Sequence, residues 1–163
     1  MNDSRSMPTR THWLENRIPP PLVWMAAAAA MWTVARRLSP SPAATAGRTA
    51  VALFLGVIAL GIIGLGIHAF RRARTTMSPL NIQGAVTVVS SGVFGFTRNP
   101  MYVGLTALLV AWAVHLASPW ALFGPAVFAL FIDRFQIQPE ERALRSKFGT
   151  AYEEYRARVR RWI

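Results

Sequence analysis

The sequence contains no cysteine, only seven Asp+Glu and a single lysine among its 18 Lys+Arg. The absence of cysteine excludes disulfide scaffolds, thiolate zinc sites and cysteine nucleophiles. His68 and His115 have no second His, Asp or Glu at ligand spacing, so we expect no metal site. Because the chain has no cysteine, covalent thiol chemistry by the protein is also excluded.

Long apolar runs account for much of the remaining sequence. Hydrophobic residues make up 53% of the chain, charged residues make up 15%, and the mean hydropathy is +0.30. Because the apolar residues come in blocks, this composition predicts a small multi-pass membrane protein. The formal net charge is +11, and the cations flank apolar segments or lie in the last thirty residues. This distribution favours anionic lipid head groups, and not nucleic acid, as a partner.

Four apolar segments predict an all-α, polytopic membrane helix bundle with about four transmembrane helices. They cover residues 22–38, 50–70, 101–116 and 120–135. The second is the clearest, since residues 50–70 carry no formal charge. Only Ala117, Ser118 and Pro119 separate the last two segments, which should form a tight antiparallel hairpin. Residues 1–17 are polar and do not resemble a cleaved signal peptide.

Small residues recur in the second apolar segment. Ala52, Gly56 and Gly64 lie at multiples of four residues, which would allow close helix packing. Glycine is also ordinary filler in membrane helices, so both explanations stay open. Because such helices pack within one chain or between two, the sequence leaves the oligomeric state open.

From Pro139 the pattern changes to that of a charged amphipathic helix. Pro139 suits the first helical position, and Glu140 and Glu141 fall in the first turn, where the helix dipole favours anions. Gly149 interrupts the run, which predicts a bend or two shorter helices. We expect this C-terminal part to lie on the cytoplasmic side, against the membrane surface or the bundle.

The distribution of arginine predicts the orientation in the membrane. With four spans, residues 1–17, the loop 71–98 and the C-terminal region share one side and hold 15 of the 18 Lys+Arg. Arg36, Arg37 and Arg48 lie on the opposite side. The positive-inside rule therefore places both termini in the cytoplasm, and we assign the chain to a bacterial inner membrane.

Two polar motifs stand beside the apolar runs on this same side. They are SGVFGFTRNPMYVG at residues 91–104 and QPEER at residues 138–142. Glycine allows close backbone approach, arginine binds carboxylate or phosphate, aromatic rings stack, and glutamate accepts from hydroxyl or ammonium groups. These types fit a nucleoside-containing cofactor that carries positive charge. The alternative is a structural boundary, because Asn99 and Pro100 also suit the N-cap and first position of a helix.

The first motif, together with PEERAL at residues 139–144 and FGTAYEEY at residues 148–155, resembles a known superfamily in order and spacing. It is the isoprenylcysteine carboxyl methyltransferase and phospholipid methyltransferase superfamily of integral membrane enzymes, and the resemblance covers roughly residues 71–163. It implies one membrane methyltransferase domain over residues 1–163. This domain comprises a polar segment 1–20, two anchor helices in 21–70 and a cofactor-binding catalytic core in 71–163.

The resemblance further implies a site for S-adenosyl-L-methionine, with S-adenosyl-L-homocysteine as product. The implied cofactor-binding residues are Gln83, Val86, Thr87, Val88, Val89, Phe94, Asn99, Pro100, Met101, Tyr102 and Glu140. Catalytic roles fall to Tyr102, Arg98 and Glu141, of which Arg98 and Glu141 would orient the loop and the helix around the ligand. The expected reaction is methyl transfer to an oxygen, nitrogen or sulfur nucleophile of a membrane lipid or other amphiphilic small molecule.

Two positions depart from the prenylcysteine enzymes of this superfamily. Asn99 replaces a histidine, and an amide cannot accept a proton near neutral pH. Gln136 replaces an arginine associated with substrate. Both changes indicate an acceptor other than a prenylated protein. The alternatives are a non-catalytic membrane anchoring or assembly protein and an NADPH-dependent enzyme similar to sterol reductases.

Overall fold

The computed structural model describes residues 15–39, 45–73 and 87–163, and in these ranges it contains helices and loops but no strand. The prediction of an all-α fold is therefore confirmed. The α-helices are α1 (Pro20–Leu38), α2 (Ala46–Arg72), α3 (Pro100–Leu116), α4 (Phe123–Ile132), α5 (Gln138–Phe148) and α6 (Thr150–Arg158). Short elements join them, namely the 3₁₀ helices η2 (Gly92–Gly95) and η3 (Pro119–Leu122) and the π-helical turn η4 (Asp133–Ile137).

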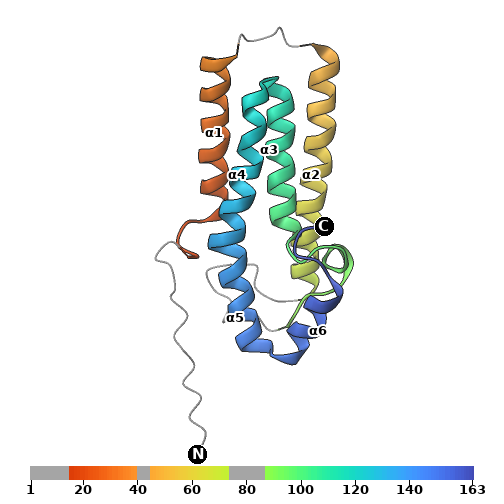
Figure 1. Cartoon of the computed structure of the whole chain (residues 1–163). Coiled ribbons are helices and arrows are strands. Elements are labelled where there is room, and N and C mark those ends of the chain that lie inside the picture. Colours follow the sequence, from red (N-terminus) through yellow and green to blue (C-terminus); the bar gives the residue numbers. More distant parts are fainter. Residues whose placement is uncertain (1–14, 40–44, 74–86) are drawn as a thin grey trace, which may run out of the picture.

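Helices α1 to α4 lie side by side as a bundle, with α5 and α6 at one end (Figure 1). Helix α2 packs chiefly against α3, whereas α1 packs against α3 and α4. Two indole N–H groups join α1 to α3. Trp24 Nε1 donates to the Leu105 carbonyl oxygen at 3.0 Å, and Trp112 Nε1 donates to that of Ala28 at 3.1 Å. These hydrogen bonds satisfy the polar atoms of both rings in apolar surroundings.

The predicted hairpin is formed by α3 and α4, which pack against each other. Helix α3 ends at Ala117, whose φ of +49° is left-handed and reverses the chain. The neighbouring Ser118 is buried, and its hydroxyl forms a 2.7 Å hydrogen bond with that of Ser39 at the end of α1. The turn therefore also fixes α1 at this end of the bundle.

Two described helical runs are long and apolar enough to cross a membrane: α2 and the continuous run Pro119–Phe148. Helix α3 is a shorter apolar helix. Large apolar side chains remain exposed on the outer faces of the bundle, including Leu53, Phe54, Val57 and Leu130. A surface of this kind is typical of a membrane protein. The number of four spans stays a prediction.

The sequence pattern predicts that a helix begins at Pro139, but helix α5 does not begin there. It continues from η3 through α4 and η4 in one helical run. Pro139 has no N–H to donate to the Phe135 carbonyl, which instead accepts a 3.0 Å hydrogen bond from the Asn16 backbone N–H. The π-helical turn ends at Ile137, two residues before this proline. The amphipathic part then forms two helices, because the chain turns at Gly149 with a φ of +50°.

Helices α2 and α3 approach each other closely at Gly104, which is not among the small residues that the sequence pattern singled out. A Cβ added to Gly104 of α3 would lie 2.9 Å from the Ala59 carbonyl oxygen and would clash with Ile63. Gly56 and Gly64, by contrast, have open space beside them. Within this chain, Gly56 and Gly64 therefore take no part in close helix packing, and packing between two chains stays a prediction.

Candidate functional site

A cavity of about 350 Å³ lies at the end of the bundle where α2 ends and α3 begins. Its wall is formed by residues of α2, α3, α5 and α6, by residues 87–89, and by Pro20 and Pro21 at the start of α1. Most lining side chains are apolar or aromatic, and a few polar groups converge on the space. Both size and composition are typical of a small-molecule site.

The structure brings the described predicted site residues to this one cavity. Those lining it are Thr87, Val88, Val89, Phe94, Arg98, Asn99, Pro100, Met101, Tyr102, Glu140 and Glu141. Gln83 and Val86 lie outside the described residues. The two motifs, some forty residues apart in the sequence, are therefore neighbours in space.

Tyr102 and Glu140 join the two motifs inside the cavity. The Tyr102 hydroxyl, on the first turn of α3, donates a 2.6 Å hydrogen bond to Glu140 Oε1 on the first turn of α5. The predicted span 120–135 ends before α5, at the charged residues Asp133 and Arg134, so Glu140 lies beyond this span. Burial raises the pKa of the Glu140 carboxyl to about 7, against the lowering effect of the Tyr102 hydrogen bond. This carboxyl therefore changes its charge near neutral pH.

Arg98 and Glu141 form a second link, in the wall of the cavity. Arg98 Nη2 donates to Glu141 Oε1 at 2.9 Å, and the two side chains are only 8% and 9% exposed. Arg98 Nη1 also donates to the Arg156 carbonyl oxygen at 3.1 Å. Because both charges are paired within the protein, they hold the loop before α3 against α5 and α6.

Asn99 occupies the N-cap position of α3, but its side chain forms no capping hydrogen bond. Its Nδ2 instead donates to the Arg161 carbonyl oxygen at 3.0 Å. Pro100 is the first residue of α3, as the sequence predicts. The side chain of Asn99 therefore serves a contact between distant segments, and not the start of the helix.

Aromatic residues close the side of the cavity formed by η2. Phe94 is buried and meets Phe70 of α2 edge to face, with 5.1 Å between ring centroids. The carbonyl oxygen of Phe94 accepts a 2.8 Å hydrogen bond from the Tyr155 hydroxyl. Tyr152 and Tyr155 of α6 also line the cavity. Helix α6 is thus a wall of the site, a role that its charged sequence does not indicate.

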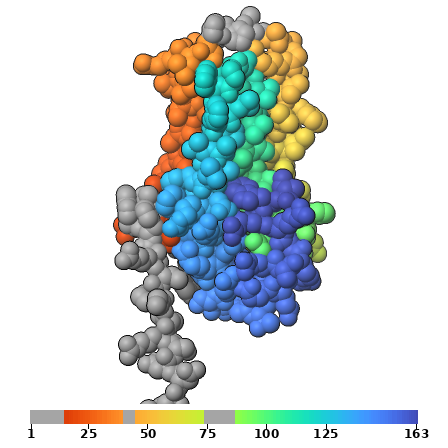
Figure 2. Space-filling model, in the orientation of Figure 1, coloured from red at the N-terminus to blue at the C-terminus, as the bar shows by residue number. Residues whose placement is uncertain are grey.

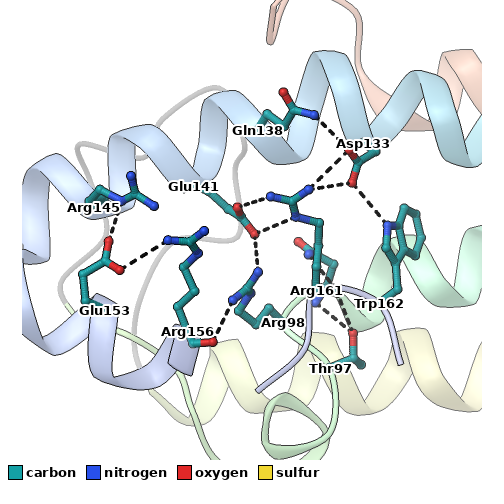
Figure 3. A network of polar contacts seen from close by, with 11 residues as sticks. Thr97, Arg98, Asp133, Gln138, Glu141, Arg145, Glu153, Arg156, Arg161 and Trp162 are labelled. Atoms are coloured by element: carbon teal, nitrogen blue, oxygen red, sulfur yellow. Dashed lines mark hydrogen bonds and ion pairs between the residues drawn. The ribbon is translucent and has the colours of Figure 1, made fainter. Parts of the chain in front are cut away.

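Sequence reasoning missed three linked residues beside the cavity, of which Arg161 contacts Glu141. Arg161 donates to Glu141 through Nε at 3.1 Å and through Nη2 at 2.6 Å (Figure 3). Its Nη1 lies 3.3 Å from Asp133 Oδ1, which also accepts from Trp162 Nε1 at 3.2 Å. The only local signal was an arginine-rich C-terminal segment, which does not distinguish Arg161 from its neighbours.

Gln136 lies away from this cavity. It is fully buried in η4, and its Nε2 donates to the Ile18 carbonyl oxygen at 2.8 Å. It therefore fixes the segment before α1 against the π-helical turn. In the described part of the chain, no group of three or more His, Asp and Glu residues is placed to hold a metal ion.

Comparison with known proteins adds independent information. The family model described as phospholipid methyltransferase matches residues 47–151. An uncharacterised protein of Haemophilus influenzae is 44% identical over 63 residues, which are 39% of this chain and 100% of that protein. The protein-S-isoprenylcysteine O-methyltransferase of Xenopus laevis is 34% identical over 73 residues, which are 45% of this chain.

This chain spans only 25% of the length of the Xenopus enzyme. No solved structure matches the chain. The family match, however, covers more than half of the chain and confirms the superfamily that the motifs predict. The protein is therefore a member of the phospholipid methyltransferase family.

Proposed function

We propose that the protein transfers a methyl group from S-adenosylmethionine to an oxygen, nitrogen or sulfur nucleophile of an amphiphilic or membrane-embedded acceptor, at the cytoplasmic membrane face. Membership of the phospholipid methyltransferase family supports methyl transfer as the reaction class. The observation that carries the proposal is the cavity in which Tyr102 and Glu140 meet. It joins a polar pair to an aromatic wall at the end of an apolar bundle.

The residues present fit this cofactor. The cavity volume of about 350 Å³ lies within the range of small-molecule sites. Tyr102 engages one oxygen of Glu140, and a carboxylate has further acceptor positions for hydroxyl or ammonium groups. Phe94, Tyr152 and Tyr155 supply aromatic faces, which attract cations. An acidic, aromatic cavity suits a ligand that carries a sulfonium and an ammonium group.

When bound, S-adenosylmethionine supplies a methyl group already activated by its sulfonium, so no protein nucleophile is needed. The chain's own task is then to bind, orient and exclude water. Glu140 would hold a positively charged group, with Tyr102 fixing the orientation of its carboxyl. Arg98 and Glu141, paired with each other, would keep the loop and α5 in place around the ligand.

The apolar part of the wall supports an amphiphilic acceptor. Ile63 of α2 and Leu105 of α3 line the cavity on the side of the bundle, and Pro20 and Pro21 lie at the start of α1. An acceptor with an apolar tail is stabilised in such surroundings while its head reaches the polar pair. We therefore propose that the acceptor approaches from the bilayer.

We also propose a multi-pass topology with both termini on the cytoplasmic side of a bacterial inner membrane. The segment before α1 is bonded to η4 at Ile18, and the C-terminal segment is bonded to the loop before α3, so both lie toward the end of the bundle that holds the cavity (Figure 1). Arg36 and Arg37 lie in the last turn of α1, at the opposite end. The positive-inside rule supports this orientation.

Calorimetric titration of the detergent-purified protein with S-adenosylhomocysteine and with NADPH tests the proposal. We expect saturable binding of S-adenosylhomocysteine alone, weakened in Glu140→Ala and Tyr102→Ala. Thr33→Ala is the control, since Thr33 is exposed on α1 and bonds only the Ala29 carbonyl of its own helix. Tight NADPH binding would overturn methyl transfer in favour of a reductase, and binding of neither ligand would favour an anchoring role.

A further inference from the structure

Residues 159–163 follow α6 and return along the bundle to the cavity wall, and we call them the C-terminal strap. We propose that Arg161 of this strap is a positioning residue, which fixes the loop before α3 with its backbone carbonyl and α5 with its guanidinium group. In this role it sets the position of one polar motif relative to the other. The effect on ligand binding rests on the proposed function, whereas the structural role does not.

The backbone of the strap holds the loop before α3. Thr97 Oγ1 and Asn99 Nδ2 both donate to the Arg161 carbonyl oxygen, at 3.2 Å and 3.0 Å. The backbone N–H of Arg98 donates to the Arg160 carbonyl oxygen at 2.9 Å. Three consecutive loop residues are therefore bonded to two consecutive strap residues. Thr97 is 5% exposed, so its hydroxyl depends on this partner within the protein.

The side chain of Arg161 holds the other motif. Its Nε and Nη2 donate to both oxygens of Glu141, at 3.1 Å and 2.6 Å, as a bidentate pair. Glu141 is thereby bound between Arg161 and Arg98 (Figure 3). A planar guanidinium group fixes the direction of a carboxylate better than a single ammonium group does. Glu140 precedes Glu141 on α5, so a shift of one moves the other.

The strap is itself fixed at the next residue. Trp162 packs against the main apolar core, and its indole N–H donates to Asp133 Oδ1 at 3.2 Å. Gln138 Nε2 donates to Asp133 Oδ2 at 3.0 Å. In Figure 2 the dark blue C-terminal residues lie against the bundle over the green segment before α3. The strap is therefore a packed part of the structure, joined to α4–α5 as well as to the loop.

Geometry of this kind matters because small displacements of binding groups reduce binding and rate strongly. Without the Arg161 guanidinium group, the buried Glu141 carboxylate keeps one cationic partner, Arg98, and the strap that carries the carbonyl acceptors of the loop loses its link to α5. We expect the loop to open more often and the cavity to bind its ligand less tightly.

Arg161→Gln tests the inference, with Arg158→Gln as the matched control. Arg158 is exposed on α6, and its Nε donates only to the Glu154 carbonyl of its own helix, so the control removes the same charge without touching the site. Hydrogen exchange followed by mass spectrometry reads the loop directly, in peptides that cover residues 93–104. Titration with S-adenosylhomocysteine reads the cavity. Arg161→Lys keeps the charge but not the bidentate geometry, and it serves in place of Arg161→Gln should that variant not fold.

We expect Arg161→Gln to accelerate hydrogen exchange in residues 93–104 and to weaken S-adenosylhomocysteine binding by about tenfold. For Arg161→Lys we expect an exchange rate and an affinity between those of Arg161→Gln and the wild type. If Arg161 acts through Glu141, the double variant with Glu141→Gln binds no more weakly than Glu141→Gln alone. Unchanged exchange, or fully additive losses in the double variant, would overturn the inference. If the wild type binds no S-adenosylhomocysteine, the proposed function fails, and the exchange of residues 93–104 still decides the role of the strap.

Discussion

The hydroxyl of Tyr102 and the carboxyl of Glu140 lie 2.6 Å apart, although 38 residues separate them in the sequence. Each stands on the first turn of a different helix, one at the start of α3 and the other at the start of α5. Both line the same cavity. A hydrogen bond between them therefore couples the two polar motifs at the point where a ligand would meet them.

Tyr102→Phe removes this hydrogen bond and leaves the ring in place. The Glu140 carboxyl then loses the one contact that lowers its pKa, so its neutral form gains at pH 7. Loss of a hydrogen bond to a charged group costs about 1.5–3 kcal/mol, so we expect S-adenosylhomocysteine to bind about tenfold or more weakly. Calorimetric titration measures this change.

Thr106→Val is the control for Tyr102→Phe. Thr106 lies one turn further along α3, and its hydroxyl donates to the Tyr102 carbonyl oxygen at 2.8 Å, not to the cavity. Like Tyr102→Phe, the Thr106→Val variant loses one hydroxyl group from α3. Equal loss of affinity in both variants would mean that α3 is disturbed as a whole and that the pair has no specific part in binding.

The raised pKa of Glu140 predicts how stability depends on pH. The pKa of this carboxyl is about 7 in the folded protein, against 4.5 for an unperturbed glutamate, so between these values the folded state binds a proton that the unfolded state has lost. The contribution of this proton to the stability of the folded protein is therefore complete below about pH 4.5 and is lost as the pH rises through 7. Thermal unfolding in detergent across this range should give a lower melting temperature at the upper end.

Glu140→Gln isolates this effect, because the amide has the shape of the carboxyl but does not titrate. The variant should be less sensitive to pH than the wild type between about pH 4.5 and 7. An identical dependence on pH in both proteins would place the titration in other groups.

Ligand binding should also release protons near neutral pH. A cationic ligand favours the charged form of Glu140 and lowers its pKa from about 7, so a fraction of a proton leaves on binding at pH 7. Calorimetric titration with S-adenosylmethionine, in two buffers of different ionisation enthalpy, measures this fraction. The Glu140→Gln variant should release a smaller fraction of a proton when it binds the ligand. Release that is the same in both proteins would assign the proton to another group.

Local patterns were sufficient to predict much of this structure. The uncharged residues 50–70 predicted α2, and the short gap at Ala117–Pro119 predicted the hairpin, because both depend on neighbours in the sequence. The two motifs are also local: the first leads into the start of α3, and the second lies where the long helical run continues into α5. Charge distribution predicted that they share one side of the membrane, and the family resemblance predicted that they form one site.

What could not be predicted depends on distant partners. Arg161 stands among Arg156, Arg158 and Arg160, and only the return of the chain after α6 selects it to bind Glu141. Pro139 has the sequence signature of a helix start, yet the helix runs through it because the Asn16 N–H satisfies the Phe135 carbonyl. Neither partner is visible in a local pattern. The same holds for Gly104, whose need for a glycine comes from α2.

Gly104→Ala tests the contact between α2 and α3 that supports the start of α3. An added methyl group would clash with Ile63 and lie 2.9 Å from the Ala59 carbonyl oxygen, which belongs to the backbone and cannot move aside alone. Overpacking of this kind costs about 1–3 kcal/mol. We therefore expect a lower melting temperature in detergent, measured by circular dichroism.

Gly61→Ala is the matched control, since Gly61 of α2 has no atom within 4 Å of an added Cβ. Alanine also favours a helix over glycine, so the melting temperature of this variant should be equal to or higher than that of the wild type. Opposite signs for the two glycines follow from their surroundings, because the chemical change is the same. If Gly104→Ala is as stable as Gly61→Ala, the two helices do not pack as closely as the structure has them, and the position of Pro100 to Tyr102 must depend on other contacts.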